Sequence, residues 1–434
     1  MTLPKIAASI NNIDPIFLDQ YNKNNLYVVV FENSSLYKFT LKNFQKDKII
    51  TIKNLKNKDL VNLDFLETTE MTDLAKRLKE SGVEYFVLPH KNLQKIEEWS
   101  KKNKIKMTAP SSILQENLED KLFFDEILKK YKLSSPKTFT KNSLPKDKSY
   151  VLQKAKSIAS LGTTFHKNPK TLLETLSKMS ETEQKNYLIR EYLNGVPVGI
   201  SIFLDKDGNY FFSGMRRQCF DYKGIFPHIF LGIQWLRKDF FPKPAMKKIY
   251  LLMESLAKTL LKQNFIGIAN IDVVIYKNIP YIIECNPRMS SATQHVFSVP
   301  NMCNIKNPWE FFLNTFCGNK NIKVKANKTP KTNFEGCLLD VDVMQKTKIT
   351  HVPEIGTYSL ENNKVKFISG DLKDFTDDKK RFFIFHDLSD KKMEYENCTI
   401  CTIVSNYPLF NVKTGKLNQK GKFLHDYFKK KMTT

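Results

Sequence analysis

Two apolar runs that follow each other near residue 280 constrain the fold of this chain more than any other feature of its sequence. IDVVIY (271–276) and YIIECN (281–286) both have the composition of buried strands. The second run nevertheless carries Glu284 and Asn286, which lie two positions apart and therefore share one face of a strand. A buried strand that ends in an acid and an amide needs a chemical reason for both.

The spacing of the two runs predicts a hairpin that brings two acids together. A loop of three residues, Lys277 to Ile279, sets Asp272 directly opposite Glu284, whereas an even loop puts Asp272 on the wrong face. Two carboxylates and an amide oxygen that meet in a buried sheet repel one another without a cation, and such hard oxygen ligands suit Mg²⁺. The alternative is a salt-bridged end of the sheet, in which Arg288 neutralises Glu284.

Composition limits the classes of function that fit. The chain has 434 residues, 41% of them hydrophobic, which is enough for two or three globular domains. Its net charge of +24 does not predict nucleic-acid binding, because only seven of the 69 basic residues are Arg and no basic stripe with interleaved aromatic residues occurs.

Cysteine usage and hydropathy indicate the compartment. Seven cysteines without framework spacing indicate a reducing compartment, and Cys398 and Cys401 are expected to be packed in the strand-like run CTICTIVS. Without a leader or a run of 18 apolar residues, the chain is expected to be cytoplasmic and to have no membrane partner.

The first 112 residues predict a separate layer. LYVVVF (26–31) and YFVLP (85–89) have the pattern of buried strands, and DLAKRLKESG (73–82) has that of a helix closed by Gly82. This alternation predicts a small α/β domain with a parallel sheet over residues 1–112.

The rest of the chain predicts two further domains. Residues 113–317 alternate strands and helices, with one helix expected over 118–133 and a long loop over 213–235. Residues 318–434 begin with a lysine-rich linker and continue as a strand-rich C-terminal domain. The expected fold class is therefore α/β and α+β.

The acidic hairpin resembles the signature of a known superfamily. Asp272, followed twelve positions later by Glu284-x-Asn286-Pro287-Arg288, resembles the ATP-grasp superfamily of ADP-forming ligases, which includes D-alanine:D-alanine ligase, biotin carboxylase and carbamoyl-phosphate synthetase. The resemblance covers residues 113–317 and implies a two-lobed ATP-grasp domain preceded by the usual α/β layer. It implies that Asp272, Glu284 and Asn286 bind Mg²⁺ ions that bridge the ATP phosphates, and that Arg288 stabilises the phosphorylated intermediate.

The order of the other motifs also resembles that of the superfamily. Lys121 is placed toward the nucleotide, Lys154 at the end of VLQK is placed at the phosphates, and LIREYLNG (188–195) resembles the hinge that reads adenine. The phosphate loop is poor in glycine, and hydroxyl groups supplement its backbone amides. The resemblance implies nucleotide-binding roles for Lys121, Lys154, Gly162, Glu191, Tyr192 and Leu193. The hydroxyl groups of Ser157, Ser160, Thr163 and Thr164 are the candidates to hold a phosphate in place of the missing glycines.

The residues after Arg288 restrict the type of ligase. Met289-Ser290-Ser291-Ala292 replaces the glutamine and glutamate that biotin carboxylases use for bicarbonate, and a single unit does not suffice for carbamoyl-phosphate synthesis. The resemblance implies a ligase that joins a carboxylate, an amino acid or peptide-like small molecule, to an amine through an acyl phosphate.

The segment 213–235 supplies two further catalytic candidates. Arg216 or Arg217 is expected to grip a substrate carboxylate or the γ-phosphate, while His228 and His295 are expected to be structural.

The sequence leaves two properties of the protein open. A non-catalytic nucleotide-binding scaffold is the alternative function, and the chain either forms a homodimer or does not.

Overall fold

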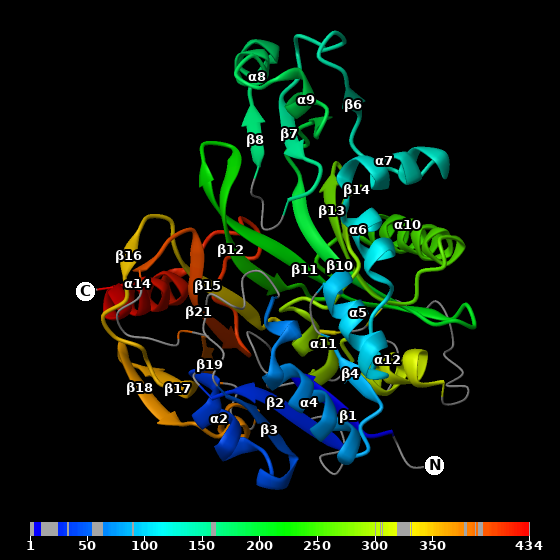
Figure 1. Ribbon diagram of the computed structural model, residues 1–434. Coiled ribbons are helices and arrows are strands. Elements are labelled where there is room, and N and C mark those ends of the chain that lie inside the picture. The colour runs from blue at the N-terminus through cyan, green and yellow to red at the C-terminus, as the bar shows by residue number, and fades with distance from the viewer. Residues whose placement is uncertain are drawn as a thin grey trace.

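The computed structural model shows a small lobe, a long central sheet and an N-terminal layer (Figure 1). It describes residues 4–9, 25–32, 34–53, 64–88, 91–157, 162–299, 301–303, 305, 307–318, 330, 332–376, 380–386, 388 and 394–433. Most of the expected linker at 319–333 lies outside these residues, as does Ser160 of the expected phosphate loop. In the described part of the chain, none of the helices has the length and hydrophobicity that a membrane span requires.

The N-terminal layer is a parallel sheet with strand order β3-β2-β1-β4-β5, as predicted. The predicted helix at 73–82 begins earlier, at Thr69, and ends before Gly82, which has a φ of +71°. The elements of this layer are β1 (Ile6–Ser9), β2 (Leu26–Phe31), α2 (Leu36–Asn43), η1 (Lys46–Lys48), β3 (Ile49–Ile52), η2 (Asp64–Glu67), α4 (Thr69–Glu80), β4 (Tyr85–Val87), α5 (Gln94–Asn103) and β5 (Lys106–Met107).

The helix predicted over 118–133 is two helices. α6 (Ser112–Glu119) ends before Asp120, and α7 (Lys121–Lys130) begins after it. The Asp120 carboxylate accepts hydrogen bonds from the backbone N–H groups of Leu122 and Phe123, so it is the N-cap of α7. Asp is one of the preferred N-cap residues. The apolar periodicity of residues 118–133 alone does not show that the helix is interrupted at Asp120.

The small lobe is an antiparallel sheet with strand order β6-β9-β7-β8, at the top of Figure 1. One face of the sheet packs Tyr150 and Leu152 against Leu172 and Leu176 of its helix. Its elements are β6 (Thr138–Phe139), β7 (Tyr150–Lys154), β8 (Thr163–His166), α8 (Pro169–Leu176), α9 (Glu181–Gln184) and β9 (Tyr187–Glu191).

The central sheet has ten strands in the described part of the chain, in the order β14-β13-β10-β11-β12-β15-β21-β19-β17-β18. Its first five strands belong to the second lobe and its last five to the C-terminal segment, which therefore continues the same sheet. The strands are β10 (Val196–Leu204), β11 (Tyr210–Lys223), β12 (Phe226–Trp235), β13 (Gly267–Tyr276), β14 (Ile279–Asn286), β15 (Cys337–Val343), β17 (Gly356–Glu361), β18 (Lys364–Ser369), β19 (Arg381–Phe385) and β21 (Cys398–Ser405).

Helices cover this sheet. α10 packs the apolar residues Ile249, Met253 and Leu256 into one core with the strands, and α14 packs Leu424 and Phe428 into another core with the C-terminal strands. The remaining elements are α10 (Lys243–Lys262), α11 (Thr293–Ser298), α12 (Pro308–Cys317), β16 (Thr347–Lys348), α13 (Leu372–Thr376), β20 (Glu394–Tyr395) and α14 (Gln419–Thr433).

The segment 213–235, predicted to be a long loop, is most of the hairpin formed by β11 and β12. Register shifts next to Cys219 and Asp221 interrupt the alternation of inward and outward side chains. Because β-bulges break the two-residue period, the segment does not have the pattern of a regular strand.

Candidate active site

A large cavity lies between the small lobe and the central sheet. Its volume is about 1610 Å³, and β7, β9, β11, β12, β13 and β14 contribute to its wall together with C-terminal strands. The candidate residues that line it are Lys121, Ser157, Thr163, Thr164, Glu191, Tyr192, Leu193, Arg216, Asp272, Glu284, Asn286 and Arg288. Lys154, Gly162 and Arg217 are not among the lining residues.

Asp272 and Glu284 are direct partners on β13 and β14, as predicted, but the predicted loop is wrong. The turn has only two residues, Lys277 and Asn278, both with positive φ as a tight hairpin turn requires. From this turn the register pairs Val273 with Ile282, and it then shifts by one residue. A β-bulge on β14 therefore corrects the register, and it places the second acid opposite the first.

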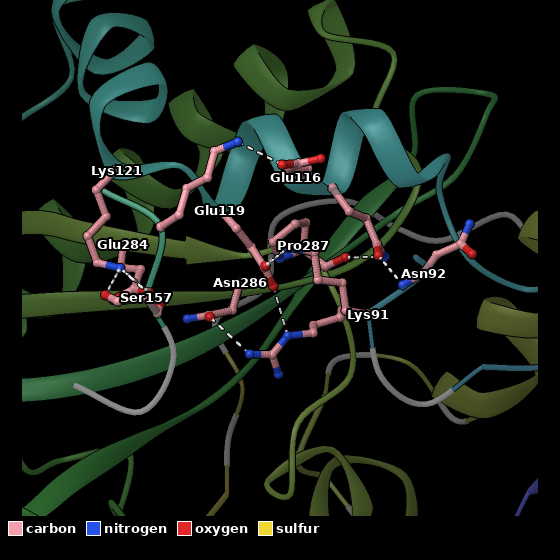
Figure 2. Close-up of polar contacts among 12 residues, drawn as sticks. Lys91, Asn92, Glu116, Glu119, Lys121, Ser157, Glu284, Asn286 and Pro287 are labelled. Atoms are coloured by element: carbon pink, nitrogen blue, oxygen red, sulfur yellow. Dashed lines mark hydrogen bonds and ion pairs between the residues drawn. The ribbon is translucent and has the colours of Figure 1, made fainter. Parts of the chain in front are cut away.

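Lys121 is the counter-ion of Glu284. Its Nζ lies 3.1 Å from Oε1 of Glu284 and also donates to the backbone oxygen and hydroxyl of Ser157, at 3.4 and 3.3 Å (Figure 2). Burial, and then the neighbouring Glu284 carboxylate, raise the pKa of Asp272 well above its ordinary value. The pair therefore has less positive charge around it than two ionised carboxylates need.

Arg288 does not neutralise Glu284, so the salt-bridged alternative is wrong in that respect. The Arg288 Nε donates to Oε1 of Glu119 at 2.9 Å, and the other oxygen of Glu119 lies 2.8 Å from Nζ of Lys91. The remaining nitrogens of the guanidinium make only long contacts, 3.4 Å to Asn286 Oδ1 and 3.5 Å to the backbone oxygen of Met289. They lie at the cavity and are available to an anionic ligand.

α6 also holds the loop that follows β14. Gln115 donates its side-chain amide to the backbone oxygen of Pro287 at 2.8 Å, and the backbone N–H of Asn92 donates to Gln115 Oε1 at 2.6 Å (Figure 2). The N-terminal layer therefore supports the segment that carries Arg288.

Arg216 and Arg217 lie on opposite faces of β11. Arg216 faces the cavity, where it donates to Ser201 Oγ at 3.1 Å and to Asn270 Oδ1 at 2.9 Å, and burial lowers its pKa to about 10. Arg217 donates to the backbone oxygen of Val412 at 3.1 Å and does not line the cavity. The geometry supports a site role for Arg216 and gives the one predicted for Arg217 no support.

Lys154 does not point into the cavity, which contradicts the predicted direction. It is exposed, and on β7 it shares its parity with Tyr150 and Leu152, which pack against α8. The residues of β7 that line the cavity are Val151 and Gln153. The strand pattern VLQK does not reveal which face of β7 is turned to the cavity.

The hinge forms the aromatic end of the cavity. The Tyr192 ring packs against Phe165 and Phe226, with centroids 5.5 and 5.0 Å apart, and its hydroxyl donates to the backbone oxygen of Ile225 at 2.7 Å. Glu191 pairs with Lys148 at 2.9 Å. This end offers apolar and aromatic surface, which suits a planar heterocycle.

The sequence predicts no specific role for several cavity residues. Arg190, one of four arginines in the middle of the chain, where a guanidinium is expected in a site, is 1% exposed and lines the cavity beside Gln153. Asp340 and Thr402 of the C-terminal strands line it as well. His295 is buried and bonded to the indole N–H of Trp235 at 2.9 Å, in agreement with the structural role predicted for it. All seven cysteines are free; Cys401 is buried in the core as predicted, whereas Cys398 is only partly buried.

The donor set of the acid pair suits a hard divalent cation. No group of three or more His, Cys, Asp or Glu side chains suited to a metal occurs in the described residues. A cation here would be held by the Asp272 and Glu284 carboxylates and the Asn286 amide oxygen, with the rest of its ligands from elsewhere. Mg²⁺ commonly binds in this way, with one or two carboxylates and the phosphates of a substrate. The residues present therefore fit a magnesium-bound phosphate ligand.

A family profile described as an ATP-grasp domain matches residues 118–292. This segment contains both lobes and the acid pair. Residues 118–292 form an ATP-grasp domain. No curated protein sequence matches the chain.

Solved structures share the fold at low sequence identity. The biotin carboxylase domain of a 2-oxoglutarate carboxylase from Hydrogenobacter thermophilus superposes with a TM-score of 0.61 at 13% identity, over 94% of this chain and 87% of that one. An L-amino acid ligase from Bacillus licheniformis also gives 0.61 at 13% identity, over 100% and 98% of the two chains. A phosphoribosylamine–glycine ligase from Thermotoga maritima gives 0.57 at 12% identity, over 98% and 96%. The ATP-grasp fold and the surrounding layers are therefore common to all four chains.

Proposed function

We propose that this protein is an ATP-dependent ligase that joins a carboxylate to an amine and releases ADP and phosphate. In the proposed reaction a carboxylate oxygen attacks the γ-phosphorus of ATP, ADP leaves, and the resulting acyl phosphate is attacked by the amine with loss of phosphate. An amino acid or a peptide-like small molecule is the proposed carboxylate.

The observation that carries this proposal is the opposition of Asp272 and Glu284 at the cavity, with Arg288 just beyond the same strand. Phosphoryl transfer is catalysed mainly by positioning and by neutralisation of charge. Magnesium held by the two acids and Asn286 would neutralise the phosphate oxygens of ATP. Arg288 and Arg216 would meet the negative charge of the transferred group.

The hinge residues support one orientation of the nucleotide in the cavity. Glu191, Tyr192 and Leu193 line the aromatic end of the cavity, and the acid pair lies on strands of the other lobe. Adenine is proposed to bind at the hinge and the phosphates to extend toward Lys121 and the acids. Ser157 and Thr163 flank this path.

The solved neighbours support a ligase chemistry without defining its substrates. One is described as a complex with MgADP and bicarbonate, and the others are named as an L-amino acid ligase and a glycine ligase. The first is also described as a dimer. A homodimer of this chain would be recognised by light scattering.

The test uses hydroxylamine as a general amine. Purified protein is incubated with Mg²⁺, ATP, hydroxylamine and single amino acids or dipeptides, and ADP and hydroxamate are both measured. We expect some carboxylates to give hydroxamate and ADP in equal amounts, and Asp272→Asn to give neither. ATP that binds tightly without ADP release under any condition would instead favour the non-catalytic scaffold.

A further inference from the structure

We propose that Arg190 is a positioning residue that holds the β-bulge at Ile283 and so keeps Glu284 on the cavity face. The inference rests on the proposed function, because Glu284 matters here as a ligand of magnesium. Arg190 belongs to β9 of the small lobe and Ile283 to β14 of the large lobe. The residue therefore acts across the two lobes that enclose the nucleotide cavity.

The bulge decides which side chain of β14 meets Asp272. Val273 pairs with Ile282 and Asp272 pairs with Glu284, so Ile283 has no partner opposite it on β13. In the regular register set by the two-residue turn, Ile283 would lie opposite Asp272 and Glu284 would point to the other face of the sheet.

Burial along β14 shows the same shift. Ile282 and Cys285 are buried in the core, whereas the two residues between them, Ile283 and Glu284, are both partly exposed and both line the cavity. Two consecutive residues on one face are the mark of an inserted residue in a strand. The Glu284 side chain therefore reaches the cavity only because the bulge is present.

Arg190 bonds to the inserted residue itself. Its Nη1 donates to the backbone oxygen of Ile283 at 2.6 Å. A bulge disrupts the ladder locally and leaves backbone groups of the extra residue without their usual partners. A charged donor at this oxygen therefore supplies a hydrogen bond that favours the bulged conformation over the regular one.

The guanidinium is held in place by other elements. Its Nη2 lies 3.3 Å from Oδ1 of Asp125 on α7, and Asp125 also pairs with Lys129 at 2.7 Å. Nη1 contacts Gln153 Oε1 on β7 at 3.3 Å. A planar guanidinium can reach acceptors on three elements at fixed angles, whereas the single ammonium of Lys cannot.

The first test measures magnesium and nucleotide separately. Arg190→Met is combined with Asp125→Asn, so that the buried Asp125 carboxylate is not left with the exposed Lys129 as its one ionic partner among the described residues, and nucleotide binding is measured by calorimetry with and without Mg²⁺. We expect Mg²⁺-dependent binding to weaken by about tenfold or more, a loss typical of residues that orient metal ligands. Binding without Mg²⁺ should change little, and Arg190→Lys should recover only part of the loss. Equal Mg²⁺ dependence in wild type and the double variant would overturn the proposal.

A deletion separates support of the bulge from direct contact with the ligand. Removing Ile283 leaves Glu284 opposite Asp272 in a regular register, so Glu284 no longer needs the bulge. In this background the Arg190→Met and Asp125→Asn pair should weaken Mg²⁺-dependent binding far less than in the full chain. A loss of the same size in both backgrounds would mean that Arg190 contacts the ligand directly, and the proposal would be wrong.

A measurement without nucleotide and a control variant separate the role of Arg190 from the proposed function. Amide hydrogen exchange in the ligand-free protein should be faster in β14 of the double variant, which reports the bulge without any nucleotide. Arg77→Met is the matched control, because Arg77 also donates to a backbone oxygen of another element, that of Thr51 at 3.0 Å, but lies in the N-terminal layer. If wild-type protein binds no magnesium nucleotide, the proposed function fails, whereas slow exchange in the double variant contradicts only the role of Arg190.

Discussion

Arg288 forms an ion pair with Glu119 at 2.9 Å, and this pair leaves two nitrogens of the guanidinium directed to the cavity without a short bond. Glu119 is in turn paired with Lys91 of the N-terminal layer (Figure 2). The arginine at the end of the acidic strand is thus oriented before any ligand binds. Preorganised donors of this kind stabilise charge that develops during a reaction.

Arg288→Ala should abolish turnover and leave nucleotide affinity largely intact. Interactions made mainly in the transition state lower kcat more than ground-state binding, and loss of one such donor costs about 3 kcal/mol, roughly a hundredfold or more in rate. Arg288→Lys should rescue little because an ammonium cannot form a bidentate contact. Calorimetry and ADP release measure the two effects, with the exposed Arg237→Ala as control. A collapse of ATP affinity with unchanged turnover at saturation would contradict this role.

Glu119→Gln should lower kcat by roughly tenfold with little change in KM for ATP, because the neutral amide no longer fixes the Arg288 guanidinium. Glu116→Gln is the matched control on the same helix, since Glu116 pairs with Lys156 at 2.7 Å instead. Steady-state kinetics of ADP release distinguish the two variants. Equal effects of both substitutions would show that only the general charge of α6 matters.

Asp272→Asn should stabilise the ligand-free protein at alkaline pH. The pKa of Asp272 is raised in the folded state, so the native protein binds more protons than the unfolded chain, and stability falls as pH rises from the ordinary carboxyl pKa through the raised one. The Asn variant lacks this loss, and we expect a gain on the order of 1 kcal/mol at pH 8. The gain should shrink as pH is lowered, and a denaturant titration at several pH values measures it. A gain that is independent of pH would exclude this cause.

Gly199→Ala should displace Arg216 from the cavity floor. Gly199 lies on β10 between Asp272 and Arg216, and an added Cβ would meet the Arg216 guanidinium carbon at 2.9 Å. Misplacement by about 1 Å can cost up to a hundredfold in rate, so we expect a tenfold to hundredfold fall in ADP release. Gly370→Ala, where the nearest atom is an ordinary 3.5 Å away, serves as control. Wild-type rates for Gly199→Ala would mean that the position of Arg216 is not critical.

The pattern of the acidic hairpin was sufficient to predict the centre of the site. Chemistry required Asp272 and Glu284 on one face, and the structure confirms their pairing. The hairpin that produces this pairing differs from the predicted one. Positive φ at Lys277 and Asn278 permits a turn of two residues instead of three, and the bulge at Ile283 restores the register. Periodicity alone does not indicate a single inserted residue.

The directions of other side chains also depend on contacts that the local sequence pattern does not contain. The face of β7 that meets the cavity depends on how α8 packs, so the direction of Lys154 could not be predicted from VLQK. Arg216 and Arg217 alternate across β11, whose sequence predicts a loop. The contribution of Asp340 and Thr402 depends on pairing between β12 and β15, which is distant in sequence. Such long-range contacts leave no local pattern.

The continuity of the ten-stranded sheet limits how the chain can be shortened. Gly232, Ile233 and Gln234 of β12 pair with residues 337–339 of β15, so a protein ending after residue 318 would expose these backbone groups along an open strand. An unpaired apolar edge is a template for pairing with other molecules. We expect such a truncated chain to self-associate and precipitate, even though it retains the acid pair and both lobes. The C-terminal segment thereby also protects the rest of the molecule from aggregation.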